Sequence, residues 1–156
     1  MATDSNNSGI KAPPPLVVLA CLAVAWGLEI VIPTTTGLQP IIRFPLGWAL
    51  ILGAILFVVW LFRGFSRIGE EYDYKKVPTK LVTDGAFAWS RNPGYAAMVG
   101  SCAGFALAFD NLWALAAGVI AYFALDILVI RKEEAILERQ FGDAYRAYRT
   151  RVRRWI

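Results

Sequence analysis

Polar side chains that could take part in chemistry occur at a few places in an otherwise apolar chain. Arg91 and Asn92 precede one long apolar run, and the adjacent acids Glu133 and Glu134 follow another. Asp126 lies inside that second run. Carboxylates and guanidinium groups bind charged ligand groups, and an acid inside an apolar run is costly unless it meets a polar partner or cavity. These residues are the first candidates for a functional site.

Residue types that are missing narrow the chemistry further. The sequence contains no histidine, which excludes histidine-based acid–base catalysis, HExxH metal sites, Ser-His-Asp triads and histidine-ligated haem. Cys21 and Cys102 each lie alone in an apolar run, so their spacing indicates neither a disulfide framework nor a zinc site. We therefore expect no metal centre.

The composition indicates an integral membrane protein. Apolar types make up 57% of the 156 residues, which is too high for a soluble domain of this length. Residues 1–15 are polar and then proline-rich and predict a disordered tail, whereas residues 16–156 predict a single all-α membrane domain. Apolar runs near the roughly 20 residues of a membrane-spanning helix predict about four spans. They cover residues 16–32, 46–62, 95–109 and 112–130, and the third is short.

Two short motifs position the last two predicted spans. Asp110-Asn111 leaves room only for a tight turn, so these spans are expected to form an antiparallel hairpin. Asn92-Pro93 favours a helix start, with asparagine at the N-cap and proline at the first helical position. A helix start beside Arg91 suits an anionic ligand group, but the same motif also serves as a cap alone.

The distribution of cations predicts the orientation in the membrane. Lysine and arginine concentrate between the second and third spans and after the fourth, while the other connections hold only Arg43. The positive-inside rule then predicts an inner-membrane protein with the loop of residues 63–91 and both termini in the cytoplasm.

Beyond residue 130 the pattern becomes amphipathic. Apolar and aromatic residues recur every three or four positions, and Gly142-Asp143 predicts a break between two helices. These C-terminal amphipathic helices lie at the membrane interface or cover a cytoplasmic pocket, and the two arrangements are compatible. The stripe comprises Leu137, Phe141, Tyr145, Tyr148, Val152 and Trp155.

The acids around the end of the fourth span are expected to face the start of the third. If the last helix continues past residue 130, Asp126 and Glu133 are seven positions apart and share a face. Asp126 is then a functional candidate, or it simply reaches water or a neighbouring cation. Because both arms of the hairpin return to one membrane face, we expect Arg91 and Tyr95 to lie near these acids in a water-accessible pocket.

Two stretches resemble a known family. Residues 81–95, LVTDGAFAWSRNPGY, resemble the pattern LVTxGxYxxxRHPxY of the isoprenylcysteine carboxyl methyltransferases and the related phospholipid N-methyltransferases. Residues 133–148 resemble that family's ending, EExxLxxxFGxxYxxY. Two motifs in the right order make a more specific signal than either alone.

The resemblance implies a membrane methyltransferase that uses S-adenosylmethionine in a pocket on the cytoplasmic side. Its acceptor would be lipid-like or isoprenoid and would receive the methyl group on a carboxyl, amine or thiol. The family's catalytic positions fall on Arg131 and Glu134. Its cofactor-binding positions fall on Lys80, Leu81, Val82, Phe87, Arg91, Asn92, Pro93, Gly94, Tyr95 and Glu133.

This chain departs from the family pattern at two of those positions, where Asn92 replaces histidine and Phe87 replaces tyrosine. Asparagine still offers an amide donor, so we expect the pocket to survive. A sulfonium methyl is already activated, and its transfer requires positioning and exclusion of water rather than a metal or a histidine. The expected partners are membrane lipids and a lipophilic or lipidated substrate, with neither nucleic acid nor metal.

Two other functions are compatible with the sequence. Membrane reductases of the sterol reductase type have similar C-terminal helices and bind NADPH in a comparable pocket. A non-enzymatic membrane scaffold would need no active site. Binding of S-adenosylmethionine, of NADPH or of neither separates the three functions, while the methyl acceptor and the oligomeric state are left open.

The cation distribution makes the topology testable. We predict that reporter fusions at Gly37 and after Ile156 report opposite sides of the membrane, because Gly37 lies in a cation-poor connection. The measurement compares alkaline phosphatase and fluorescent-protein fusions at both positions. Equal behaviour of the two fusion sites would contradict the predicted topology.

Overall fold

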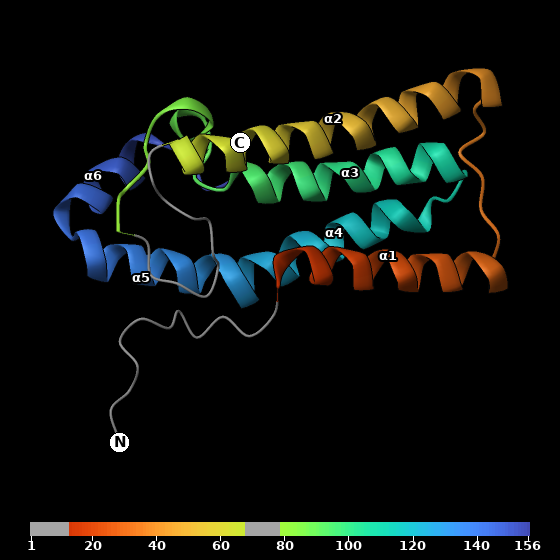
Figure 1. Cartoon of the computed structure of the whole chain (residues 1–156). Helices are drawn as coiled ribbons and strands as arrows, with labels where there is room; N and C mark the ends of the chain where they lie inside the picture. The colour runs from red at the N-terminus through yellow and green to blue at the C-terminus, as the bar shows by residue number, and fades with distance from the viewer. Residues whose placement is uncertain (1–12, 68–78) are drawn as a thin grey trace.

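The computed structural model describes residues 13–67 and 79–156, and its regular elements there are all helical. Helices α1 and α2 are followed by the hairpin of α3 and α4 and then by α5 and α6 (Figure 1). Single short turns, η1 and η2, precede α3 and α5. The bounds are Pro14–Val31 (α1), Pro40–Arg67 (α2), Gly85–Ala88 (η1), Pro93–Phe109 (α3), Trp113–Leu125 (α4), Asp126–Ile130 (η2), Arg131–Phe141 (α5) and Asp143–Arg151 (α6).

The all-helical prediction is confirmed for the described residues, and three of the helices are long and apolar enough to cross a membrane. These are Pro14–Val31, Pro40–Gly64 and Trp113–Phe141, whereas α3 is a shorter apolar helix of 17 residues. Of the predicted tail, residues 1–12 lie outside the described residues, and Pro14 already begins α1. Helix α2 also begins before its predicted start and contains Pro45, although proline normally marks a helix boundary.

Helices α1 to α4 pack in the order α2, α3, α4, α1, with α3 and α4 as the predicted antiparallel hairpin (Figure 1). Asp110 ends α3 in the left-handed conformation, with φ of 55°, which aspartate tolerates better than most residues. Its carboxylate accepts hydrogen bonds from the backbone N–H and the hydroxyl of Thr36 at 2.8 and 2.6 Å. The hairpin turn is thereby fastened to the connection between α1 and α2.

Helices α2 and α3 approach each other closely at glycines. A Cβ atom on Gly47 would overlap the backbone of Ala108, and one on Gly104 would lie 2.9 Å from the carbonyl oxygen of Gly47. Small residues let membrane helices gain van der Waals contact that larger side chains would block. The glycines therefore determine how near α2 lies to the hairpin.

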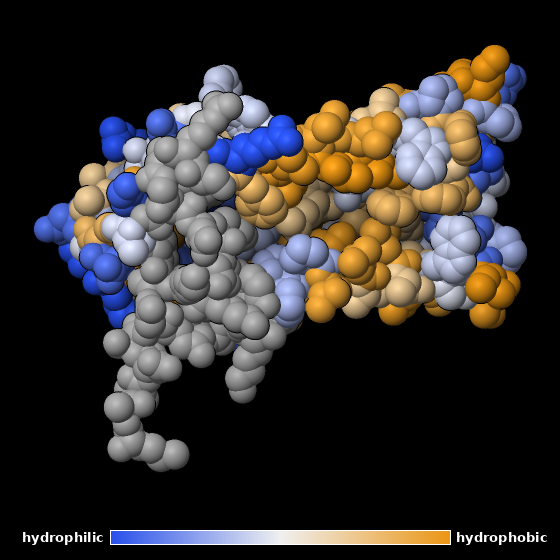
Figure 2. All heavy atoms as spheres, in the orientation of Figure 1, coloured by the Kyte–Doolittle hydropathy of each residue, from blue (hydrophilic) through white to orange (hydrophobic). Residues whose placement is uncertain are grey.

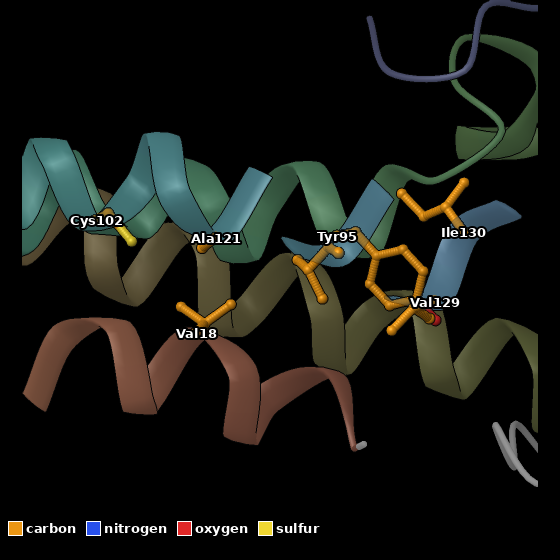
Figure 3. Packing of buried hydrophobic residues seen from close by; sticks show 7 residues of the cluster. Val18, Tyr95, Cys102, Ala121, Val129 and Ile130 are labelled. Carbon is orange, nitrogen blue, oxygen red and sulfur yellow. The ribbon is translucent and has the colours of Figure 1, made fainter. Parts of the chain in front are cut away.

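A buried cluster joins α1 to the hairpin (Figure 3). Val18 of α1 meets Cys102 of α3 and Ala121 of α4, and Tyr95 lies at the end of the cluster beside Val129. Outside this cluster, many large apolar side chains of α1 and α2 are exposed. They form an apolar surface over the middle of the visible face, while hydrophilic side chains gather at the end that carries α5 and α6 (Figure 2). This surface is suited to contact with lipid tails.

The last spanning helix continues without interruption from α4 through η2 into α5. Its middle portion, η2, is a π-helical turn, in which the backbone winds more widely than in an α-helix. Helix α5 then ends at Gly142, whose φ is +50°, and α6 begins at Asp143. The predicted break at Gly142-Asp143 is confirmed.

Gly47→Ala tests the close approach of α2 and α3. We expect it to reduce the free energy of unfolding by about 1–3 kcal/mol, because the new methyl group would overlap backbone atoms that cannot rotate away. Thermal unfolding in detergent measures the effect. Gly53→Ala on the same helix is the matched control, since a Cβ atom there meets no atom within 4 Å. Equal stability of the two variants would contradict the packing of α2 on α3.

Candidate functional site

Both segments that carry the family resemblance lie at one end of the bundle. The chain from residue 79 to the start of α3 meets α5, α6 and the C-terminal residues there, whereas the connection between α1 and α2 lies at the opposite end (Figure 1). The expectation that the start of α3 faces the paired acids of α5 is confirmed by direct contacts. The candidate site is therefore built at the end of the spanning helices.

The strongest contact at this end joins Arg91 to Glu134. The Arg91 guanidinium donates from Nη2 and Nε to one carboxylate oxygen of Glu134, at 2.7 and 3.2 Å. Its remaining Nη1 donates to the carbonyl oxygens of Arg149 and Val152, each at 3.0 Å. Both side chains of the ion pair are only 9% exposed. The sequence predicted a water-accessible pocket here. The structure instead has the ion pair nearly buried.

Arg154 completes the cluster from the C-terminal segment. Its Nη2 and Nε donate to Glu134 at 2.7 and 3.1 Å, and its Nη1 donates to Asp126 at 3.1 Å. The hydrogen bond to Glu134 holds the pKa of the Arg154 guanidinium above its usual range. Asp126 also accepts a hydrogen bond from Nε of Arg131 at 2.9 Å. Asp126 therefore has two cationic partners and is not an isolated acid.

Glu133 has a different environment from its neighbour. The Tyr95 hydroxyl donates to its carboxylate at 2.7 Å, and the side chain is half-buried. Within residues 13–67 and 79–156, no cationic side chain lies within ion-pair distance of Glu133. Of the two adjacent acids, Glu134 is engaged by arginines, whereas Glu133 is hydrogen-bonded to Tyr95 and has no cationic partner among the described side chains.

The expected alignment of Asp126 with Glu133 is wrong. Arg154 bonds to Asp126 and Glu134 with the same guanidinium, so these two acids lie on one side of the helix. The π-helical turn between them accounts for the difference, because each of its turns holds about one residue more than an α-helical turn. Side chains eight residues apart therefore lie on one side of the helix here, as side chains seven residues apart do in a regular α-helix.

The segment before α3 is bound to the C-terminal segment through its backbone. Ser90 and Arg153 form an isolated parallel bridge, in which the Arg91 N–H donates to the Arg153 carbonyl at 2.9 Å. Asn92 occupies the predicted N-cap position of α3, but its side chain makes no capping hydrogen bond. The Asn92 amide instead donates to the carbonyl of Arg154 at 3.0 Å.

The remaining predicted positions lie around this cluster. Val82 and Phe87 line a small, mostly apolar hollow of about 160 Å³ together with Trp60 and Leu61 of α2. Leu81 is half-buried, Lys80 and Arg131 are exposed, and Pro93 is buried as the first residue of α3. Gly94 lies against Leu61, where a Cβ atom would be 3.2 Å from a methyl carbon.

Two tyrosines of α6 were predicted only as part of a helical stripe, and both are buried next to the cluster. Burial raises the pKa of Tyr148 to about 12, and its hydroxyl donates to the Phe87 carbonyl at 2.7 Å. Burial and the Glu134 carboxylate raise the pKa of Tyr145 to about 12. Both phenols therefore stay protonated at neutral pH. Among the described residues the Tyr148 hydroxyl has a hydrogen-bond acceptor, whereas the buried Tyr145 hydroxyl has no partner.

Comparison with known families assigns the chain to one of them. The sequence model of the phospholipid methyltransferase family matches residues 42–144, which is about two thirds of the chain. The chain belongs to this family. The family is one of the membrane methyltransferases of the isoprenylcysteine carboxyl methyltransferase type, so the resemblance seen in the sequence is confirmed. No curated protein and no solved structure matches the chain.

Family membership and the long apolar helices together make this a membrane protein of a methyltransferase family. The matched residues include Arg91, Tyr95 and both acids of α5. They end before α6 is complete, so the match does not include Arg154. Arg154 was not among the predicted site residues, because several arginines follow one another near the C-terminus and nothing in their spacing selects one.

Burial of the ion pair changes the expected effect of removing it. Arg91→Ala and Glu134→Gln should each destabilise the fold by about 3–5 kcal/mol, because each leaves a buried charge without its partner. Thermal unfolding in detergent measures this.

Arg146→Ala is the matched control, since Arg146 is 60% exposed and its ion pairs are open to solvent. We expect the control to unfold at the wild-type temperature. If Arg91→Ala unfolded at that temperature too, the buried cluster would not contribute to stability as described.

Proposed function

We propose that this protein transfers a methyl group from S-adenosylmethionine to a lipid-like or isoprenoid acceptor at the cytoplasmic face of the membrane. The observation that carries the proposal is the Tyr95–Glu133 pair, which lies beside the buried arginine cluster where the two family motifs meet. The proposal also rests on the family match, which covers both partners of the pair.

The chemistry of these residues fits the methyl donor. S-adenosylmethionine carries an α-ammonium group, a carboxylate and a sulfonium, and when bound it supplies an activated methyl group. Glu133 has no cationic partner among the described side chains, so its carboxylate is suited to accept hydrogen bonds from the cationic α-ammonium group. Tyr95 orients the Glu133 carboxylate, and the start of α3 places a partial positive charge nearby for the donor's carboxylate.

Arg91 and Glu134 then serve as positioning residues rather than direct contacts. All three nitrogens of the Arg91 guanidinium already donate to protein oxygens, and both oxygens of Glu134 accept from arginines. Four of the five N–H donors of Arg91 are already used, so most of the hydrogen-bonding capacity of the pair is taken up within the protein. Arg131, in contrast, is 62% exposed and is placed to meet an acceptor group that approaches from the aqueous side.

The membrane surface supplies the acceptor. The site lies at the end of the spanning helices, which is the level where lipid headgroups meet water. A lipid whose tails rest on the exposed apolar surface of α1 and α2 would hold its headgroup near this end (Figure 2). Transfer then needs in-line positioning and exclusion of water, to which the buried aromatic residues of α6 contribute.

The family match favours a methyltransferase over the alternatives of a membrane reductase and a non-enzymatic scaffold. No observation on the described residues favours either alternative. The predicted absence of a metal stays a prediction, and the binding assay below includes a chelator for that reason.

Glu133→Gln tests the proposed site. We expect full-length protein in detergent to bind S-adenosylmethionine in the presence of a chelator, and Glu133→Gln to weaken that binding by about tenfold, because it removes one charge-assisted hydrogen bond. Calorimetry measures the Kd.

Glu138→Gln is the matched control on the same helix, because Glu138 is paired with exposed arginines outside the cluster. It should bind like wild type. Incubation with radiolabelled S-adenosylmethionine and a membrane lipid extract then identifies the labelled acceptor. Wild-type protein that bound NADPH but not S-adenosylmethionine would overturn the proposed function.

A further inference from the structure

We propose that the C-terminal segment, residues 152–156, contributes to the active site and that Arg154 in this segment is a positioning residue for Glu133. The inference rests on the proposed function, in which Glu133 contacts the methyl donor. It concerns residues that lie beyond the part of the chain matched by the family.

Arg154 joins the two ends of the π-helical turn. Asp126 is the first residue of η2, and Glu134 lies in the first turn of α5, directly after η2. Arg154 donates to both acids at 2.7 to 3.1 Å, with all three guanidinium nitrogens engaged. The rigid fork of a guanidinium can hold two carboxylates in this way, whereas the ammonium group of lysine is a single point charge on a flexible stem.

The joined ends determine where Glu133 points. The π-helical turn holds about one more residue than an α-helical turn, so its presence rotates α5 relative to α4. If the turn relaxed to regular α-helix, α5 would rotate by about 100° and carry Glu133 away from Tyr95. By keeping Asp126 and Glu134 on one side, Arg154 maintains the winding in which Tyr95 reaches Glu133 at 2.7 Å.

Neighbouring contacts hold the C-terminal segment in the position from which Arg154 bonds to Asp126 and Glu134. The Arg154 carbonyl accepts hydrogen bonds from the Asn92 amide at 3.0 Å and the Ser90 hydroxyl at 3.4 Å. The next residue, Trp155, stacks on Tyr122 of α4 with ring centroids 4.3 Å apart and packs against the buried cluster of the bundle. The Arg154 backbone is thus anchored on both sides while its side chain reaches the acids.

The position of Asn92 also acquires an explanation. Asn92 occupies the place where the family pattern has histidine, and its amide binds the C-terminal segment rather than capping α3. Arg91 donates to the backbone of the same segment through its own N–H and through Nη1. The Arg91-Asn92 pair, which the family resemblance assigned to the cofactor, therefore holds in place the segment that carries Arg154.

The first experiment compares Arg154→Gln and Arg154→Lys with wild type, using the full-length protein in lipid nanodiscs. We expect Arg154→Gln to raise the Kd and KM for S-adenosylmethionine by about tenfold, because Glu133 is displaced by roughly a side-chain width. Arg154→Lys should recover part of that loss, since it keeps the charge without the fork. Calorimetry and initial-rate kinetics provide the Kd, the KM and kcat.

Arg151→Gln is the matched control. Arg151 is exposed, and its Nε donates to the carbonyl of Ala147 within its own helix, at 3.2 Å. It should keep the wild-type Kd and KM. A merely structural role for Arg154 would reduce the folded fraction, which lowers the amplitude of binding and the apparent kcat but leaves Kd and KM unchanged in the molecules that remain folded.

A double-mutant cycle with Glu134→Gln tests the route of the effect. If Arg154 acts through Glu134, the double variant should bind S-adenosylmethionine about as weakly as the weaker single variant, whereas independent effects would multiply. An unchanged Kd in Arg154→Gln, or multiplicative effects in the cycle, would overturn the positioning role. Failure of the wild type to bind S-adenosylmethionine would instead contradict the proposed function, on which this inference depends.

Discussion

The ion pair of Arg91 with Glu134, extended by Arg154, is the interaction on which the functional end of this protein depends. Three segments that are far apart in the chain, the start of α3, the start of α5 and the C-terminus, meet in it through charge-assisted hydrogen bonds. With both side chains of the pair only 9% exposed, any arrangement that separated them would leave a charge without solvent or partner. That cost holds the three segments together more firmly than an exposed pair would.

The same constraint separates the roles of two adjacent acids. Glu134 accepts hydrogen bonds from two arginines, while Glu133 accepts one from the Tyr95 hydroxyl and has no cationic partner among the described side chains. The separation depends on the π-helical turn, which determines which acid faces the arginines. At the opposite end of the bundle, hydrogen bonds from Thr36 to Asp110 connect the α3–α4 turn to the segment before α2. The helices are therefore held together by polar contacts at both ends of the bundle.

The features of the fold and the site that could be predicted are those that depend on residues close together in the sequence. The asparagine-proline helix start, the Asp110 turn and the Gly142 break depend on the conformational preferences of a few neighbouring residues, and the structure has all three where the sequence indicates. The meeting of the two family motifs also followed, because the arms of a hairpin return to one end of a bundle. The buried state of Arg91 and the partner of the Asn92 amide did not follow, since both depend on a segment that lies about sixty residues later.

The sequence by itself determined that this is a helical membrane protein of a methyltransferase family, because hydropathy and motif order are properties of the chain alone. Tertiary structure decided which acid shares a side with Asp126, because face assignments assume constant helical winding and η2 departs from it. It also decided which of several C-terminal arginines enters the site. Those side chains are chemically identical, and only the position of the backbone, anchored by Asn92 and by Trp155 against Tyr122, selects Arg154.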